Sequence, residues 1–183
     1  MAVGIGSISG SLGIVVSRKK PGHFIALGED GRIDAVLNVG GKLMDLLEKR
    51  GAISIKDVLR GSMDGSGMAP AGGVKTLDPY DITIAMPAAD GEPCVSDAER
   101  DAWSRMRNSY NVVIEAPPFQ VAGTLMLLAS QDPQSLTERG TDLFVVLFNP
   151  QVQLAGGTLR DTPRDSVLVN RSHIRRVTTT GRR

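Results

Sequence analysis

The chain has 183 residues and a net charge of +1, and its 41% apolar and 22% charged residues are typical of a globular protein. Its length suits one domain, or one domain with an appended piece, and its neutral balance gives no overall attraction to nucleic acids or acidic membranes. A single cysteine, Cys94, excludes an intramolecular disulfide and a cysteine metal cluster, and it favours a cytoplasmic location.

Residues 1–20 do not match a targeting segment. A signal peptide needs positive charge before its apolar stretch, whereas the basic residues 18–20 follow it here. The apolar run is interrupted by glycines and is too short to cross a bilayer. Residues 14–16 and the lysines after them could form a weak surface anchor, but a strand that ends in a solvated turn is the favoured interpretation.

Residues 1–60 are predicted to form an N-terminal segment of short strands and one helix. Residues 32–38 alternate as a strand does, and residues 52–59 predict another strand. Between them, Gly51 is suited to end a helix whose leucines share one face, at positions 43, 46 and 47. Residues 61–79 then form a Gly/Ser/Pro-rich stretch without periodicity, which predicts a flexible linker.

Residues 80–183 are expected to form a second, larger domain. Residues 80–87 predict a strand that stops at its final proline. A capping box of Ser96 and Glu99 then begins the clearest helix of the chain. We expect its apolar stripe to be buried against the rest of the domain, and this stripe consists of Ala102, Trp103, Met106 and Tyr110.

The rest of this domain is predicted to be β-structure. In residues 111–129 apolar and polar side chains alternate around Gly123, where we expect a sharp bend. A turn follows, and residues 142–154 form another alternating strand that Pro150 breaks. Residues 166–177 predict two short strands joined by a tight turn.

This order of elements, with the stretches "VAGTL" and "VLVNRSHI", resembles the Sm-like small β-barrel over residues 96–178. In that superfold an N-terminal helix precedes five strongly bent strands. The same residues are similar to an uncharacterised bacterial domain family that pairs a V-A-G-T-L strand with a closing V-L-V-N-R-x-H-I segment. The resemblance implies a mostly β (α+β) fold with two short helices, in which a small β-barrel follows a helix and the N-terminal β/α segment.

The resemblance does not extend to a base-binding pocket. Sm-like proteins bind uridine-type bases with an Asp and an Asn of the third strand and with an Arg-Gly pair between the fourth and fifth strands. Asp142 matches the first position, but Val146 falls at the second and Asn170-Arg171 at the third. Two of the three markers are therefore missing.

Motifs for catalysis and cofactor binding are incomplete. "GIGSISG" has the wrong glycine spacing for a dinucleotide fingerprint and no strand before it, and "NVGGKL" lacks a Ser or Thr after Lys42. His23 and His173 with one cysteine are too few for a zinc site, and no G-x-S-x-G marks a nucleophile. Asp161 and Asp165 lie in a polar loop, where capping a turn is the favoured role. We therefore predict no enzyme, no cofactor and no metal.

An excess of arginine near the end of the chain supplies the candidate binding residues, which are Arg171, His173, Arg175 and Arg176. A local basic patch can bind phosphates or an acidic partner. It lacks interleaved aromatic residues, so stacking on bases is not supported, and a basic tail that only aids solubility is an equal alternative. For His173, a hydrogen bond to a backbone carbonyl that holds the turn is favoured over a ligand role.

Two functions remain open from the residues alone. The first is a non-catalytic assembly or protein-docking module that forms a homo-oligomer, because the strand edges of a short open barrel pair readily between subunits. The alternative is a nucleic-acid-binding protein that uses the arginine-rich C-terminal edge. The sequence does not identify the partner.

Overall fold

The computed structural model describes residues 22–138, 140–157, 159–161, 163 and 165–182. The predictions made for residues 1–20 therefore lie outside the described residues, as do Arg164 and Arg183 of the arginine-rich end.

Within this part of the chain, eleven strands form one antiparallel sheet with two α-helices and three short 3-10 helices around it. The strands are β1 (His23–Gly28), β2 (Gly31–Leu37), β3 (Ile53–Gly61), β4 (Ala69–Pro70), β5 (Thr76–Leu77), β6 (Ile84–Pro87), β7 (Asn108–Ala116), β8 (Phe119–Leu127), β9 (Phe144–Leu154), β10 (Ser166–Asn170) and β11 (Arg176–Arg182). The helices are α1 (Leu43–Glu48), η1 (Pro79–Asp81), α2 (Asp97–Met106), η2 (Pro133–Thr137) and η3 (Arg171–His173).

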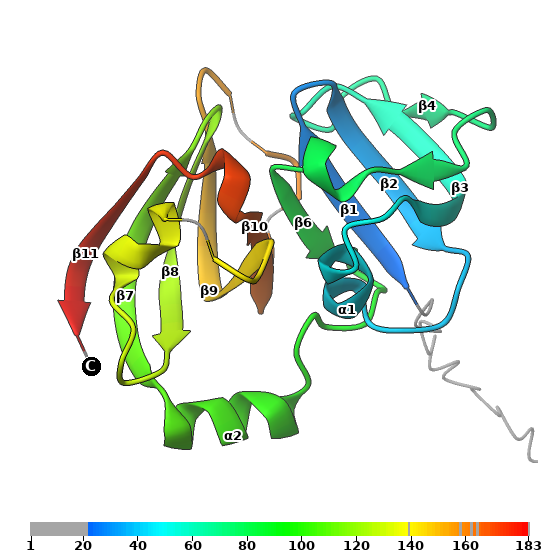
Figure 1. Cartoon of the computed structure of the whole chain (residues 1–183). Helices are drawn as coiled ribbons and strands as arrows, with labels where there is room; N and C mark the ends of the chain where they lie inside the picture. Colours follow the sequence, from blue (N-terminus) through cyan, green and yellow to red (C-terminus); the bar gives the residue numbers. More distant parts are fainter. Residues whose placement is uncertain (1–21, 139, 158, 162, 164, 183) are drawn as a thin grey trace, which may run out of the picture.

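The strand order is β11-β7-β8-β9-β10-β6-β1-β2-β3-β4, and β5 pairs separately with β3. The strands before α2 make up one half of the sheet and those after it the other half, as Figure 1 shows on its right and left sides. Both β4 and β5 fall within residues 61–79 and pair with β3. The division of the chain into two domains and a linker stays a prediction.

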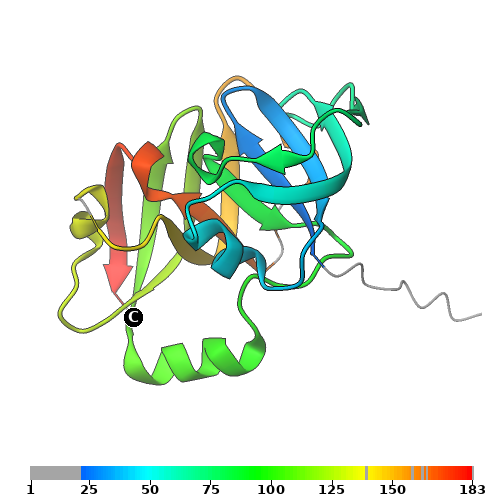
Figure 2. The ribbon, with the colours of Figure 1, turned by 45° about the vertical axis from the view of Figure 1, so that its right-hand side comes forward.

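The small Sm-like β-barrel expected for residues 80–183 is wrong. The structure is largely β with two α-helices, but its sheet is open, and β10 pairs with β9 on one side and with β6 on the other. Because β6 pairs in turn with β1, the C-terminal strands continue into the N-terminal strands instead of closing on themselves. Figure 2 shows this continuity from a second direction.

The centre of the sheet is buried on both faces, which explains why it continues. All residues of β10 are buried, and neighbouring side chains on this strand enter different cores. Leu168 joins a core that contains the three leucines of α1, and Val167 and Val169 join a core built from β7 and β8. A strand that is apolar on both faces needs a covering layer on each face, and the two halves of the chain supply these layers.

A bulge in β9 explains why Pro150 does not break this strand. Asn149 and Pro150 both lie opposite Gly123 of β8, between the regular pairs Ala122–Gln151 and Thr124–Phe148. Asn149 has a φ of 49°, and the proline sits where the ladder is already interrupted, so it removes no regular hydrogen bond. The predicted bend at Gly123 coincides with this bulge. Residues 111–129, in contrast, contain two strands, β7 and β8, that form a hairpin.

Helix α2 has the predicted capping box but not the predicted buried stripe. The Ser96 hydroxyl accepts a hydrogen bond from the Glu99 N–H, and the Glu99 carboxylate accepts one from the Ser96 N–H at 2.9 Å. The Lys42 ammonium and the Ser96 donors hold the pKa of Glu99 at about 2. Yet no residue of α2 is buried, and Met106 is 66% exposed. The helix spans from β6 to β7 below the sheet instead of packing on it (Figure 1). Of the predicted stripe, Trp103 packs edge-on against Phe148, and Tyr110, beyond the helix, packs against the other core.

Two polar side chains, the half-buried Glu48 and the buried Asn170, tie the halves together. The Glu48 carboxylate of α1 accepts hydrogen bonds from the Leu143 and Phe144 N–H groups, at 2.9 and 2.7 Å, where β9 begins. The Asn170 side chain at the end of β10 donates to the carbonyls of Pro79 and Ile82, at 3.0 and 2.8 Å. Asn170 is fully buried, so these carbonyls have no access to water as a substitute donor.

We expect the substitution Asn170→Ala to lower the free energy of unfolding by about 2 kcal/mol, because the Ile82 carbonyl loses the Asn170 donor and the Pro79 carbonyl keeps only the Ile82 N–H, at 3.3 Å. The measurement is urea denaturation followed by circular dichroism. Asn38→Ala is the matched control, since Asn38 is exposed and bonds only a neighbouring hydroxyl. Equal stability of the two variants would contradict this role of Asn170.

Candidate functional site

The structure places the four predicted binding residues on η3 and at the start of β11, and it divides them into two kinds. Arg171 is engaged with the chain itself, because its Nη2 group donates to the carbonyls of Ser135 and Glu138, at 3.0 and 3.1 Å. A Cβ atom at position 140 would overlap the Arg171 guanidinium, so glycine at this position lets the loop after η2 lie against the arginine. The contacts assign Arg171 to holding that loop in place.

His173 is engaged in the same way with η1. Its Nε2 group donates to the Tyr80 carbonyl at 2.9 Å, which leaves Nδ1 to accept from the Thr83 hydroxyl at 3.1 Å. Thr83 is fully buried, and the imidazole bridges the C-terminal turn to the segment before β6. This geometry matches the backbone-carbonyl role considered for His173 and leaves neither ring nitrogen directed to a ligand.

Arg175 and Arg176 are exposed. The guanidinium of Arg176 lies 4.0 Å from the Glu115 carboxylate, and its side chain is 70% exposed, so this pair contributes little to stability. The two arginines therefore can contact a partner without disrupting the fold. They stand where β11 begins.

Strand β11 forms one edge of the sheet and pairs with β7 alone among the described strands. It is the red strand at the left of Figure 1. Its ladder with β7 is regular from Arg176 to Thr179, a bulge follows, and the threonines 178–180 are exposed. Val177 is buried in the same core as Leu136 of η2. One face of β11 thus belongs to the core, while its outer backbone edge faces no described strand.

The opposite edge of the sheet is different. It consists of β4, which has two residues, and the second of them is Pro70. A short strand that contains proline offers few backbone donors and is a common protection against unwanted pairing. The sequence stretch "RVTTTGR" could have signalled the longer edge, because β-branched threonines favour strands and neither proline nor lysine interrupts them.

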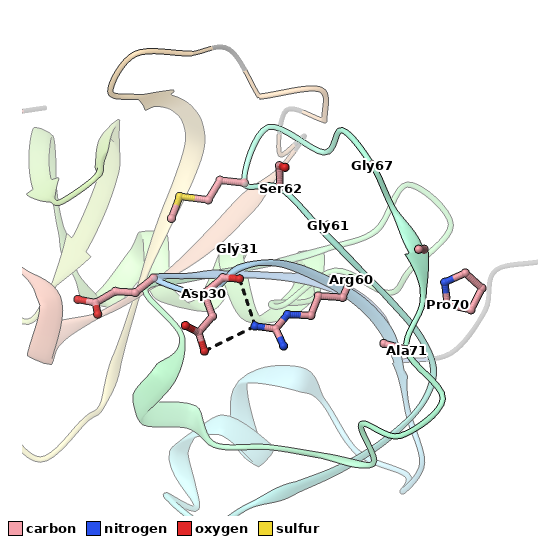
Figure 3. A pocket seen from close by; sticks show the side chains of 11 residues that line it. Asp30, Gly31, Arg60, Gly61, Ser62, Gly67, Pro70 and Ala71 are labelled. Carbon is pink, nitrogen blue, oxygen red and sulfur yellow. Dashed lines mark hydrogen bonds and ion pairs between the residues drawn. The ribbon is translucent and has the colours of Figure 1, made fainter.

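A hollow of about 620 Å³ lies beside the β4 edge, between the β1–β2 turn and the start of the β3–β4 connection (Figure 3). Two of its charged residues pair with each other, since Arg60 donates to the Asp30 carbonyl at 3.3 Å and lies 3.7 Å from the Asp30 carboxylate. Both side chains are largely exposed, at 49% and 93%. A wide hollow that is lined by exposed, hydrated charges has little to hold a specific ligand.

A cleft of about 670 Å³ lies between α2, the loop after β6 and the start of β10. Its acidic residue Asp161 bonds the buried Arg32 at 2.5 Å, and Arg32 lies 3.4 Å from Asp34 as well. Its Arg100 stacks over the Phe148 ring at 4.9 Å. The polar loop around Asp161 favours a turn-capping role, but the carboxylate pairs with a residue far away in the sequence, which no local pattern reveals.

His23 continues the series of charged side chains that runs from Asp161 through Arg32 to Asp34. Its Nε2 group is 2.6 Å from the Asp34 carboxylate, and Nδ1 contacts the Asp90 carboxylate. The imidazole joins β1, β2 and the loop after β6. Among the described residues, no group of three or more His, Cys, Asp or Glu side chains is arranged to hold a metal ion.

Cys94 is buried and lies next to the Ser166 hydroxyl. Burial raises the pKa of its thiol from 9.0 to about 12, which disfavours the thiolate that a nucleophile requires. The folded protein therefore keeps a proton on Cys94 that the unfolded chain releases above pH 9. Stability from this thiol is fully present below pH 9 and is lost as the pH rises toward 12.

We expect a thiol-exchange reagent at pH 8 to modify Cys94 rapidly in denaturant and slowly in native buffer. In native buffer its rate should follow the small fraction of molecules that unfold. The variant Cys94→Ala serves as the control for pH dependence, because it should lose less stability than the unchanged protein between pH 9 and pH 11. Rapid labelling of the native thiol would show that Cys94 is accessible.

Comparisons with known proteins do not identify the chain: no family model, curated protein or solved structure matches it. The resemblance to the Sm-like family stays a prediction. Neither of the described α-helices has the length and apolar character needed to cross a bilayer.

Proposed function

We propose that this protein is a non-catalytic docking module that receives an extended polypeptide strand at the outer edge of β11. The observation that carries the proposal is the contrast between the sheet edges. β11 has a regular, exposed ladder with one free side, whereas β4 is short and contains proline. An incoming strand can form backbone hydrogen bonds with β11 and leave the rest of the sheet unchanged.

Because β10 is already paired with β6 and β9, it has no free edge through which two copies of the chain could join. Pairing of β10 with a neighbouring subunit would require β6 to leave, together with the buried contacts of Asn170 and His173. A homo-oligomer built on the free edge requires no such change, so β11 is the surface through which we expect self-association. A cytoplasmic location, where the unpaired Cys94 stays reduced, agrees with this proposal.

Two proline variants test docking at β11, Thr178→Pro and Thr179→Pro. Neighbouring residues of an antiparallel edge strand direct their N–H groups alternately to the partner strand and outward. Proline at the outward residue should abolish self-association with an unchanged melting temperature. Proline at the inward residue should break the β7 ladder and lower the melting temperature by several degrees. The melting temperatures therefore show which of the two variants tests docking and which is the control for a damaged sheet.

Light scattering coupled to size exclusion measures the association, with the protein at tens of micromolar. We expect the unchanged protein to have a mass above that of one chain. An oligomer that persists in the variant with the unchanged melting temperature would exclude β11 as the docking edge.

Nucleic-acid binding is the second candidate, and the exposed pair Arg175 and Arg176 favours it. The double variant Arg175→Ser, Arg176→Ser should weaken binding of a single-stranded RNA probe and a duplex DNA probe by a similar factor. It should also flatten the dependence on salt by about one unit of slope for each phosphate that the variant no longer neutralises. Arg60→Ser is the control, because Arg60 is an exposed arginine on β3. Absence of probe binding at low salt in the unchanged protein would remove this candidate.

A further inference from the structure

We infer that the strand received by β11 is residues 12–17 of a second copy of this chain. This inference rests on the proposed docking function and names its occupant. The segment reads Leu-Gly-Ile-Val-Val-Ser and contains neither proline nor a charged residue. Its length, about 20 Å as an extended strand, is enough to cover the regular part of the β11 ladder.

The pattern of this segment fits an edge position. Leu12, Ile14 and Val16 alternate and would share one face of a strand, opposite Gly13, Val15 and Ser17. On β11, Val177 is buried in the core on one face, and the exposed threonines begin beside it. A docked strand could therefore place one of these apolar side chains beside Val177 and the other two on the same face, along the strand.

The geometry of the sheet makes the contact intermolecular. In the strand order β1 lies six strands from β11, and six spacings of about 4.8 Å amount to about 29 Å measured along the sheet. The residues between Ser17 and His23 can span about 20 Å at most. Figures 1 and 2 both place the start of β1 and the strand β11 at opposite sides of the molecule. The donor strand must therefore come from another copy.

Such a contact joins two different surfaces, the N-terminal segment of one copy and β11 of the next. Contacts of this head-to-tail kind generate rings or open chains instead of a simple two-fold dimer. Every described strand pair of the sheet is antiparallel, and an antiparallel donor places its basic residues 18–20 beside Arg175 and Arg176. Like charges repel and salt screens them, so assembly should strengthen as salt rises. Nucleic-acid binding would respond in the opposite direction.

The test compares the full chain, a variant that lacks residues 1–17, and the double variant Ile14→Asn, Val16→Asn. The matched control is Val3→Asn, Ile5→Asn, which places the same changes outside the proposed strand. Light scattering is recorded at low and high salt, and thermal melting confirms that each variant is folded. We expect assembly in the full chain and the control, stronger at high salt, and single-chain masses in the other two.

A labelled synthetic peptide of residues 10–18 provides a direct measurement. It should bind the variant that lacks residues 1–17, whose β11 edges have lost their donor. It should not bind the same variant with the outward-facing proline in β11. Fluorescence anisotropy reports both results, and a peptide with asparagine at positions 14 and 16 serves as the negative control.

The outcomes separate the two proposals. If removal of residues 1–17 leaves assembly intact while the β11 proline abolishes it, the donor is another segment and docking at β11 stands. If both variants still assemble, β11 is not the docking edge and both proposals are wrong. A single-chain mass for the full chain at high salt overturns the second-copy inference.

Discussion

The pairing of β6 with β10 is the constraint on which the rest of the structure depends. It is a short contact, with Ala85 opposite Leu168 and Ile84 opposite Val169, extended by a hydrogen bond from the Asn170 N–H to the Thr83 carbonyl. It nevertheless joins two sets of strands into one sheet that is buried on both faces at its centre. It also covers the edge of β10, which would otherwise be open to other molecules. In the C-terminal half of the sheet, the backbone edge that stays unpaired among the described strands is that of β11.

Polar side chains that look functional in the sequence are used mainly to hold this arrangement. Arg171 fixes the loop after η2, His173 fixes η1, and Glu48 covers the start of β9. Along β11 the described surface presents backbone donors and acceptors at a sheet edge. The proposed docking function rests on this edge.

Local features of the fold could be predicted from the sequence, because neighbouring residues determine them. The capping box of Ser96 and Glu99 and the turn after Asn170 are of this kind. The open sheet could not be predicted, because the residues of β10 indicate burial on both faces without identifying the strand on each side. The ion pair of Arg32 with Asp161 could not be predicted for the same reason. The candidate binding residues lie near β11, the strand that we propose for docking. That β11 has a free backbone edge depends on which other strands are already paired, and no local pattern shows this.

The long connection through α2 sets the order in which the chain is expected to fold. On each side of it several strands pair with their neighbours in sequence, as β1 does with β2 and β7 with β8, although β6 and β11 return to the earlier strands β1 and β7. Such local hairpins lose little chain entropy when they close, and they form quickly. The contact between β6 and β10 joins distant residues and must wait for both halves. Until then each half exposes the apolar face that the other will cover, and during synthesis this interval is when the chain is most prone to wrong pairing.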